Sequence, residues 1–172
     1  MASLASIHTY RAEVDKIIRY GGSTKETSIR RAVSSLINAY ARPRDLLLVE
    51  ELDYFNPQRK KRVTPDGTLK NILRLDHGFW ESKDTDDDFD EEIAIKFDKG
   101  YPDSKMRFED APTAIFYQDG QRIVETLFSK GEALDALLTA YVSFEPRTCG
   151  SSRKPLNVSK ATSQPPYYRS LS

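Results

Sequence analysis

Two short segments hold the residues best suited to chemistry in this 172-residue chain. Asp66 follows Pro65, and after a gap of fourteen residues Glu81, Ser82 and Lys83 form a Glu-x-Lys tripeptide. In a β-strand, side chains two residues apart point to the same face of the sheet, so Glu81 and Lys83 share a face. If the strands of Asp66 and Glu81 pair, the two carboxylates converge beside the lysine ammonium.

Such a cluster predicts a divalent cation held by oxygen ligands. Two carboxylates, a backbone carbonyl and water molecules make an octahedral site that suits Mg2+ or Mn2+. One cysteine and two histidines are too few for the usual zinc cage. The cation polarises a phosphoryl oxygen and lowers the pKa of a bound water, while Lys83 adds positive charge where the attack on phosphorus builds negative charge. The predicted reaction is hydrolysis of a phosphodiester bond; because 30% of the residues are charged, surface salt bridging is the competing interpretation.

The elements that must position these residues alternate between helices and strands. Helices are expected at about 6–19, from the capping box Ser23–Glu26 to Pro43, from Thr85 to Gly100, and from the capping box Ser129–Glu132 to Pro146. Strands are expected at 46–49, 63–69, 78–83, 113–117 and 122–125, the last two joined at the turn Asp119–Gly120. This order predicts an α/β fold in which a central mixed sheet of about five strands is flanked by helices.

Apolar residues at helical spacing predict which helix faces are buried. They are Ile29, Val33, Leu36, Ile37 and Tyr40 in the second helix, Phe89, Ile93 and Phe97 in the third, and Leu134, Leu137, Leu138, Tyr141 and Val142 in the last.

The acid, the Glu-x-Lys tripeptide and the order of elements resemble the PD-(D/E)xK nuclease superfamily. A closer resemblance is to the N-terminal, Mrr-like nuclease domain of the type ISP restriction-modification enzymes. It covers about residues 20 to 145 and rests on four blocks in order, 77–84, 99–102, 108–110 and 117–120. The resemblance implies a restriction-endonuclease-like core and a metal-dependent DNA endonuclease of a restriction-modification system.

By this resemblance, Asp66, Glu81 and Lys83 are the catalytic residues. Asp66 and Glu81 are also the expected metal ligands, with the backbone carbonyl of Ser82 as a further ligand. Glu26 matches an accessory acid that many superfamily members contribute from the first helix of the core. Its alternative role is to cap that helix, as the spacing of its capping box indicates.

The resembling enzymes are long polypeptides that also contain a helicase-like translocase, a methyltransferase and a target-recognition part. No Walker or methyltransferase motif follows residue 145 in this chain. We therefore expect a fragment, a truncated product or a free-standing relative, with helicase and methyltransferase parts encoded separately. The alternative hypothesis is a truncated, nonenzymatic DNA-binding or protein-docking module that retains the nuclease fold. A nuclease acting on RNA or branched DNA is a further alternative.

Double-stranded DNA is the expected partner, although 26 basic and 26 acidic residues give no net charge. Overall basicity therefore does not predict DNA binding. The four-residue basic block Arg59, Lys60, Lys61 and Arg62 precedes Asp66 and is interpreted as a clamp for DNA phosphates, with a solvated loop as the competing interpretation. Cleavage of both strands by one active site would require two copies, so transient dimerisation on DNA is expected.

Composition divides the chain into an N-terminal helical extension (1–20), an endonuclease-like domain (21–145) and a disordered basic tail (146–172). The tail contains five basic residues and no acid. The longest aliphatic run, 46–49, is too short to span a membrane, and the N-terminus lacks the pattern of a secretory signal. A soluble, cytoplasmic protein is expected.

Overall fold

The computed structural model describes residues 4–22, 26–83, 88–109 and 113–143. Within these ranges the helices are α1 (Leu4–Gly21), α2 (Glu26–Ala41), a short 3-10 helix (Arg42–Arg44), α3 (Phe89–Lys99) and α4 (Gly131–Ser143). The strands are β1 (Leu46–Glu50), β2 (Tyr54–Asn56), β3 (Lys61–Val63), β4 (Gly67–Asn71), β5 (Asp76–Ser82), β6 (Lys105–Glu109), β7 (Thr113–Gln118) and β8 (Gln121–Leu127). None of the described helices is long and apolar enough to cross a membrane.

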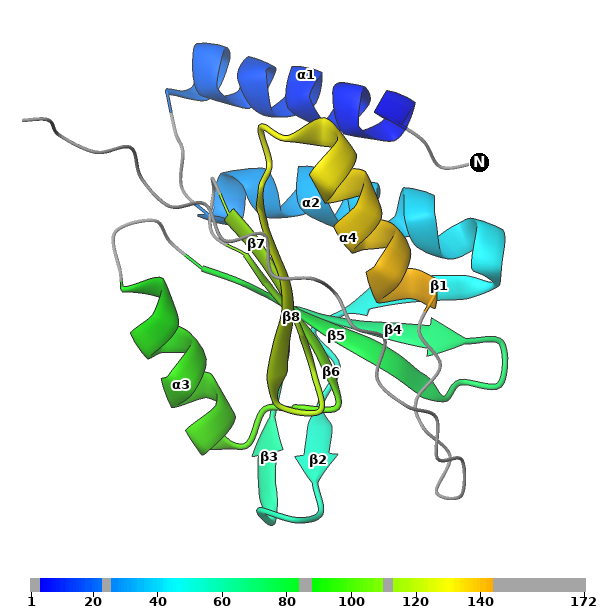
Figure 1. Cartoon of the computed structure of the whole chain (residues 1–172), viewed down its shortest axis with the longest axis vertical. Helices are drawn as coiled ribbons and strands as arrows, with labels where there is room; N and C mark the ends of the chain where they lie inside the picture. The colour runs from blue at the N-terminus through cyan, green and yellow to red at the C-terminus, as the bar shows by residue number, and fades with distance from the viewer. Residues whose placement is uncertain (1–3, 23–25, 84–87, 110–112, 144–172) are drawn as a thin grey trace, which may run out of the picture.

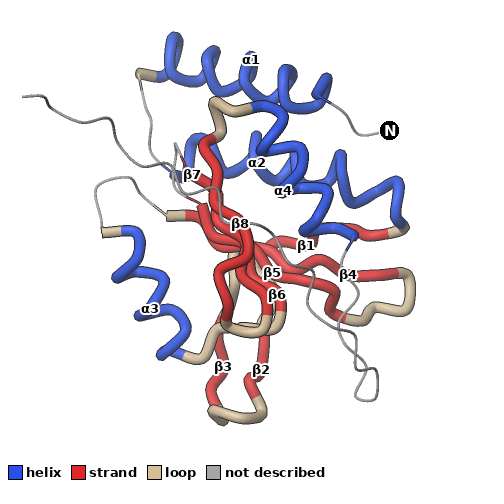
Figure 2. Tube along the Cα trace, viewed as in Figure 1, coloured by secondary structure: helices blue, strands red, loops and turns tan. Residues whose placement is uncertain are grey.

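A six-stranded sheet in the order β1-β4-β5-β6-β7-β8 forms the centre of the molecule, and β2 and β3 form a separate hairpin (Figure 2). The pair β5–β6 is parallel, whereas all other neighbours in this sheet are antiparallel. A parallel pair needs a long crossover connection, and α3 supplies it between β5 and β6. The sheet is therefore mixed, as the sequence predicted, and has one strand more than the five identified there.

Helices α1, α2 and α4 cover one face of the sheet, whereas α3 and the β2–β3 hairpin pack on the other (Figure 1). Successive strand residues supply the two faces. Trp80 and Phe116 enter the core beneath α1, α2 and α4, and their neighbours Phe79 and Ile115 enter the core beneath α3. This alternation follows from the two-residue period of a strand whose both faces are covered.

The predicted helical faces are buried. All five apolar residues predicted in α2 and all five in α4 belong to the larger core. In α3, Ile93 is buried and Phe89 and Phe97 pack partly buried against the second core. Helix α1 also contributes Ile7 and Tyr10 to the larger core, so residues 4–21 pack against the domain. The domain boundary near residue 20 stays a prediction, and the tail 146–172 lies outside the described residues.

Several predicted boundaries were wrong. The single strand expected at 63–69 is interrupted, because β3 ends at Val63 and β4 begins at Gly67. Pro65 lies in this break, where its missing N–H costs no ladder hydrogen bond. Helix α3 begins after Asp88, whose carboxylate accepts hydrogen bonds from the backbone N–H groups of residues 90 and 91. The expected start at Thr85 lies outside the described residues.

The structure also differs from the sequence predictions at the start of α4 and in strand β6. Helix α4 begins at Gly131, two residues after the Ser129 of the expected capping box. Strand β6 was not predicted, because its charged Lys105 and Arg107 are typical of an exposed segment, yet both side chains are buried. In contrast, the Asp119–Gly120 hairpin turn was predicted correctly, and both residues adopt the left-handed backbone that such a two-residue turn requires.

We expect Gly67→Ala to lower the free energy of unfolding by about 1–3 kcal/mol through overpacking. A Cβ at Gly67 would lie 2.8 Å from Leu48 Cδ1 and 2.8 Å from Cε3 of the fully buried Trp80. Urea denaturation would measure the change. Gly21→Ala is the matched control, since a Cβ there meets no atom within 4 Å, and it should leave stability unchanged or slightly raised. Equal stability of both variants would contradict the packing at Gly67.

Candidate active site

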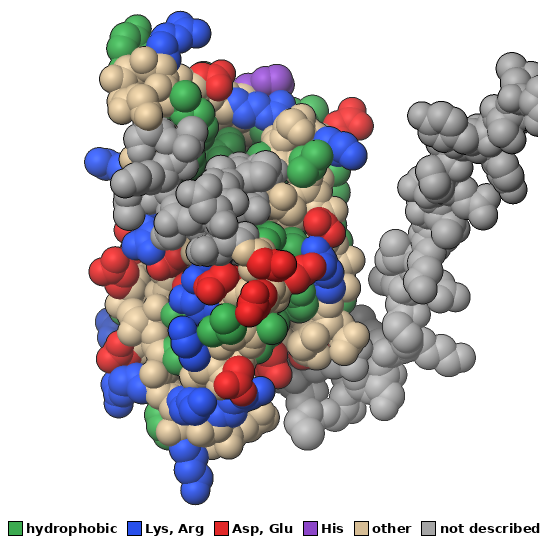
Figure 3. Space-filling view, turned by 90° about the vertical axis from the view of Figure 1, so that its left-hand side faces the viewer, with side chains coloured by type: hydrophobic (Ala, Val, Ile, Leu, Met, Phe, Trp, Pro, Cys, Tyr) green, Lys and Arg blue, Asp and Glu red, His purple; other side chains and the backbone are tan. Residues whose placement is uncertain are grey.

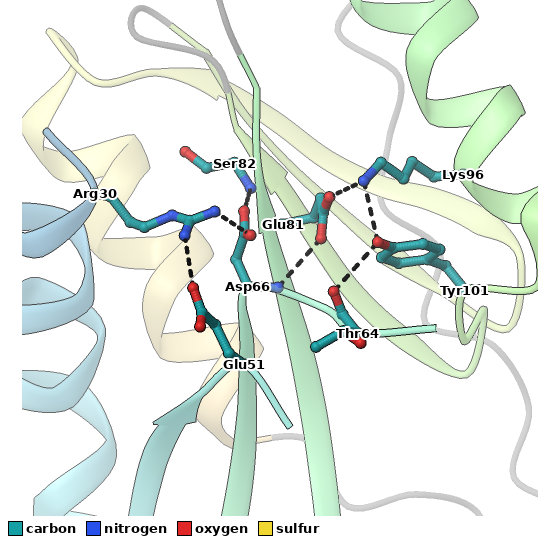
Figure 4. A network of polar contacts seen from close by, with 8 residues as sticks. All are labelled: Arg30, Glu51, Thr64, Asp66, Glu81, Ser82, Lys96 and Tyr101. Atoms are coloured by element: carbon teal, nitrogen blue, oxygen red, sulfur yellow. Dashed lines mark hydrogen bonds and ion pairs between the residues drawn. The ribbon is translucent and has the colours of Figure 1, made fainter. Parts of the chain in front are cut away.

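The antiparallel register of β4 and β5 brings Asp66 and Glu81 together (Figure 4). Gly67 pairs with Trp80, so Asp66, the residue before β4, lies beside Glu81. The backbone N–H of Asp66 donates to Glu81 Oε2 at 3.2 Å, and the N–H of Ser82 donates to Asp66 Oδ2 at 2.8 Å. Each carboxylate is therefore anchored on the backbone of the opposite segment. The side chain of Asp66 is 12% exposed and Glu81 is 3% exposed.

Two cations from different helices neutralise these carboxylates. Lys96 of α3 forms an ion pair with Glu81 Oε1. Arg30 of α2 forms an ion pair with Asp66 Oδ1 through Nη2 and another with Glu51 Oε1 at 3.3 Å through Nη1. Figure 4 shows the two cations approaching the pair of carboxylates from opposite sides. The negative charge is thus balanced by side chains of the protein itself.

Tyr101 completes this network behind Lys96. Its hydroxyl accepts a hydrogen bond from Lys96 Nζ at 3.1 Å and donates one to the carbonyl oxygen of Thr64 at 3.3 Å. The Lys96 ammonium also lies 4.5 Å from the centre of the tyrosine ring. Because Thr64 lies between β3 and β4, this chain of contacts connects Glu81 to the end of the β2–β3 hairpin.

Burial and charge both change the protonation equilibria of the site. Burial raises the pKa of Glu81 above its ordinary value, and the charge of Asp66 raises it further, while Lys96 opposes both effects. Burial also lowers the pKa of Lys96, but the hydrogen bond and charge of Glu81 outweigh it and leave that pKa raised. Burial, followed by the charge of Glu81, raises the pKa of Tyr101. The buried carboxylate therefore depends on positive charge held beside it.

Lys83 follows the last residue of β5 and, like Glu81, forms an ion pair with a residue of α3. Its Nζ atom is 2.9 Å from Glu92 Oε2, and this hydrogen bond lowers the pKa of Glu92 below its ordinary value. Glu92 and Lys96 are one helical turn apart on α3. Two ion pairs, Glu81–Lys96 and Lys83–Glu92, therefore join the end of β5 to α3. The acid comes from the β5 segment in the first pair and from α3 in the second.

The remaining predicted site residues are placed as follows. Glu26 begins α2, but its side chain lies outside the described part of the structure. Ser82 contributes its backbone N–H to Asp66, whereas a ligand role for its carbonyl stays a prediction. In the basic block, Arg59 and Lys61 donate to the carbonyl oxygen of Asp98 in α3, at 3.2 and 3.0 Å.

The residues present fit a hard divalent cation. Two neighbouring carboxylates are the oxygen ligands that Mg2+ and Mn2+ prefer. The pKa of Glu81 is raised first by burial and then by the charge of Asp66, and a bound cation would relieve both costs. Among the described side chains, no group of three or more His, Cys, Asp or Glu is arranged to hold a metal ion. The donor set described here is therefore the pair Asp66 and Glu81.

Sequence reasoning missed the counter-ions Arg30 and Lys96 and the contact of Tyr101. Arg30 comes one helical turn after Glu26, and Lys96 follows Glu92 at the same spacing, so both positions were open to inspection. Neither spacing says which helix packs against the carboxylates. Trp80 and Tyr101, the aromatic residues of these segments, are both buried.

Together these features define an α/β domain with a PD-(D/E)xK, restriction-endonuclease-like core. The chain resembles a solved structure described as a cryo-EM structure of a DrdV–DNA complex, with a TM-score of 0.80 and 35% sequence identity. The match covers 84% of this chain and 14% of the DrdV chain, so this chain spans about one seventh of that protein's length. The sequence matches no protein-family model and no curated protein.

We expect Lys96→Met to lower the free energy of unfolding by about 3 kcal/mol near pH 8, because it leaves the Glu81 carboxylate buried beside Asp66 without its ammonium. Denaturant unfolding would measure the loss. The double variant Glu81→Gln/Lys96→Met should recover most of it, since a neutral amide needs no counter-ion.

The pH dependence provides a control on the cause. The pKa of Glu81 is raised in the folded state, so the folded protein binds its proton more readily, and lowering the pH favours folding of any variant that keeps this carboxyl. The stability gap between the Lys96→Met variant and the double variant should narrow as the pH falls. A gap that does not change with pH would show that ionisation of Glu81 is not the cause, and no recovery in the double variant at any pH would assign the loss to packing of Lys96.

Proposed function

We propose that this domain is a metal-dependent DNA endonuclease of the kind found in restriction-modification systems, hydrolysing phosphodiester bonds in double-stranded DNA. The observation that carries the proposal is the meeting of Asp66 and Glu81 on neighbouring segments, each hydrogen-bonded to the backbone of the other. The 35% identity to a chain from a DrdV–DNA complex supports DNA as the substrate.

Asp66 and Glu81 would hold Mg2+ or Mn2+, with the carbonyl of Ser82 and the accessory acid Glu26 as further candidate ligands. When bound, such an ion polarises the phosphoryl oxygen and acidifies a water molecule. The hydrogen bonds from the Asp66 and Ser82 N–H groups orient the two carboxylates before any ligand arrives. Because the side chains are already ordered, binding of the ion costs little conformational entropy.

Lys83 would bind the scissile phosphate and stabilise the negative charge that develops during attack. It lies two residues after Glu81 on the same side of β5, and its present partner, Glu92, is only partly buried. Exchange of Glu92 for a phosphate oxygen would give the ammonium a strong, charge-assisted partner. Glu92 is thus proposed to hold Lys83 in place until DNA binds.

Further partners are part of the proposal. Helicase and methyltransferase parts are proposed to act together with this domain, and transient dimerisation on DNA would supply the second active site for double-strand cleavage. A cytoplasmic location, where such systems meet DNA, is part of the same proposal.

We expect Asp66→Ala, Glu81→Gln and Lys83→Ala each to lower plasmid cleavage in Mg2+ or Mn2+ by about a hundredfold or more, since each removes a ligand or a charge from the reacting group. Gel analysis of supercoiled plasmid would measure the rates. Asp15→Asn and Lys16→Ala, exposed on α1, are charge-matched controls and should cleave normally. Cleavage that persists unchanged in the three site variants would overturn the residue assignment.

A nonenzymatic DNA-binding or docking module is the second candidate, because Arg30 and Lys96 already neutralise both carboxylates. Calorimetric titration with Ca2+, which supports binding but not this hydrolysis, separates the two. Binding that Glu81→Gln abolishes supports a working metal site. No binding at millimolar Ca2+ to the correctly folded protein favours the nonenzymatic module.

A further inference from the structure

We propose that the exposed side of the β2–β3 hairpin, formed by Phe55, Lys60 and Arg62, contacts the DNA backbone within a few nucleotides of the scissile phosphate. This inference rests on the proposed function, and it divides the basic block of residues 59–62 into two residues that hold the fold and two that face DNA.

The inner side of the hairpin is fixed to the protein. Asn56 is buried and donates from Nδ2 to the carbonyl oxygen of Gly100 at 3.0 Å. Tyr54 packs edge-on against Phe79, with ring centres 4.9 Å apart. Asn56 Oδ1 also accepts hydrogen bonds from the backbone N–H groups of residues 58 and 59, which shapes the turn. The hairpin is therefore a rigid projection from the domain, visible at the lower end of Figure 1.

Two of the four cations in the block serve this attachment. Arg59 Nη1 and Lys61 Nζ both donate to the carbonyl oxygen of Asp98, in the last turn of α3. The C-terminal end of a helix carries partial negative charge, which favours cations there. Arg59 and Lys61 thus join the hairpin to α3, and their charges are directed toward the protein.

The other two cations lie on the outer side with an aromatic ring. Phe55 and Arg62 are direct cross-strand partners, and their side chains are exposed because the alternate residues, Tyr54 and Val63, face the core. Phe55 is 54% exposed. The side chain of Arg62 is 68% exposed and pairs with Asp53, which is 56% exposed, at 3.2 Å. Such exposed ion pairs are weak, so Arg62 can exchange Asp53 for a phosphate.

Charge complementarity favours nucleic acid as the occupant of this face. Lys60 is exposed at the turn of the hairpin, two residues before Arg62, so the hairpin carries two exposed positive charges and one large exposed apolar ring. Cations in such loops bind DNA phosphates, and aromatic side chains pack against sugars or bases. Figure 3 shows basic side chains at the hairpin end of the molecule, below the acidic side chains that gather over α3. The acidic surface repels DNA, so the hairpin end is the accessible approach.

The distance to the proposed active site agrees with this arrangement. Arg62 precedes Asp66 by four residues, which span at most about 14 Å in an extended chain. Phosphates along one DNA strand are about 3.4 Å apart along the helix axis. A strand whose scissile phosphate lies at Asp66 and Glu81 therefore presents phosphates no more than about four nucleotides away to Arg62, and Lys60 lies two residues further along the hairpin.

The test measures binding of a short fluorescent DNA duplex by anisotropy in Ca2+, over a series of salt concentrations. Lys60→Ala and Arg62→Ala should each weaken binding about tenfold and reduce the slope of log affinity against log salt by about one. Phe55→Ala should weaken binding without changing the slope. Arg59→Ala and Lys61→Ala are the matched controls: they remove the same charge from the same block and should lower thermal stability while binding DNA nearly as well as wild type.

Three results would overturn the proposal. The first is wild-type affinity in both Lys60→Ala and Arg62→Ala. The second is an equal loss in all four basic variants, which would mean that the block acts only as diffuse charge. The third is a wild-type protein that binds no duplex DNA, which would leave the hairpin for a protein partner. Plasmid cleavage in Mg2+ is measured separately. DNA binding that depends on Arg62, without any cleavage, would reject the endonuclease activity and support the DNA contact of the hairpin. Cleavage together with wild-type binding in the hairpin variants would support the endonuclease activity and reject the DNA contact of the hairpin.

Discussion

Two like charges held together inside a protein need compensation, and this requirement explains much of the arrangement around β4 and β5. Asp66 and Glu81 are brought together by strand pairing, and burial makes an isolated carboxylate costly. The protein answers with Arg30 from α2 and Lys96 from α3, one on each side. Helix α2 and helix α3, which lie on opposite faces of the sheet (Figure 1), are thus both joined by ion pairs to the segments that carry Asp66 and Glu81.

The centre of the site could be predicted from the sequence because it is local. Asp66 directly precedes β4 and Glu81 lies in β5, the next strand, so a hydrophobic pattern and a short connection suffice to bring them together. The side chains that surround them come from distant segments whose packing no spacing specifies, which is why Arg30 and Lys96 were missed. Strand β6 was not predicted for a related reason. Its buried Lys105 hydrogen-bonds with His77 of β5, and only the folded structure brings these two residues together.

Charge pattern alone also could not show that the four cations of the basic block make different contacts. Four consecutive cations at 59–62 suggested one phosphate clamp, but a hairpin directs alternate residues to opposite sides. Lys61 consequently faces α3 while Arg62 faces solvent, and Arg59, which lies in the turn, also donates to α3. Strand periodicity would have revealed the division had the short strands β2 and β3 been identified. Three-residue strands carry too little pattern to be recognised in a sequence.

The built-in counter-ions have one more consequence. In small domains organised around zinc, the polypeptide remains unfolded until the ion arrives, because nothing else neutralises or connects the ligands. Here an ammonium and a guanidinium already occupy that electrostatic role, so the polypeptide reaches its final shape with the carboxylates in place. Under the proposed function, folding of the protein and binding of a divalent ion are therefore separate events, and a chelator that removes the ion is expected to leave the fold intact.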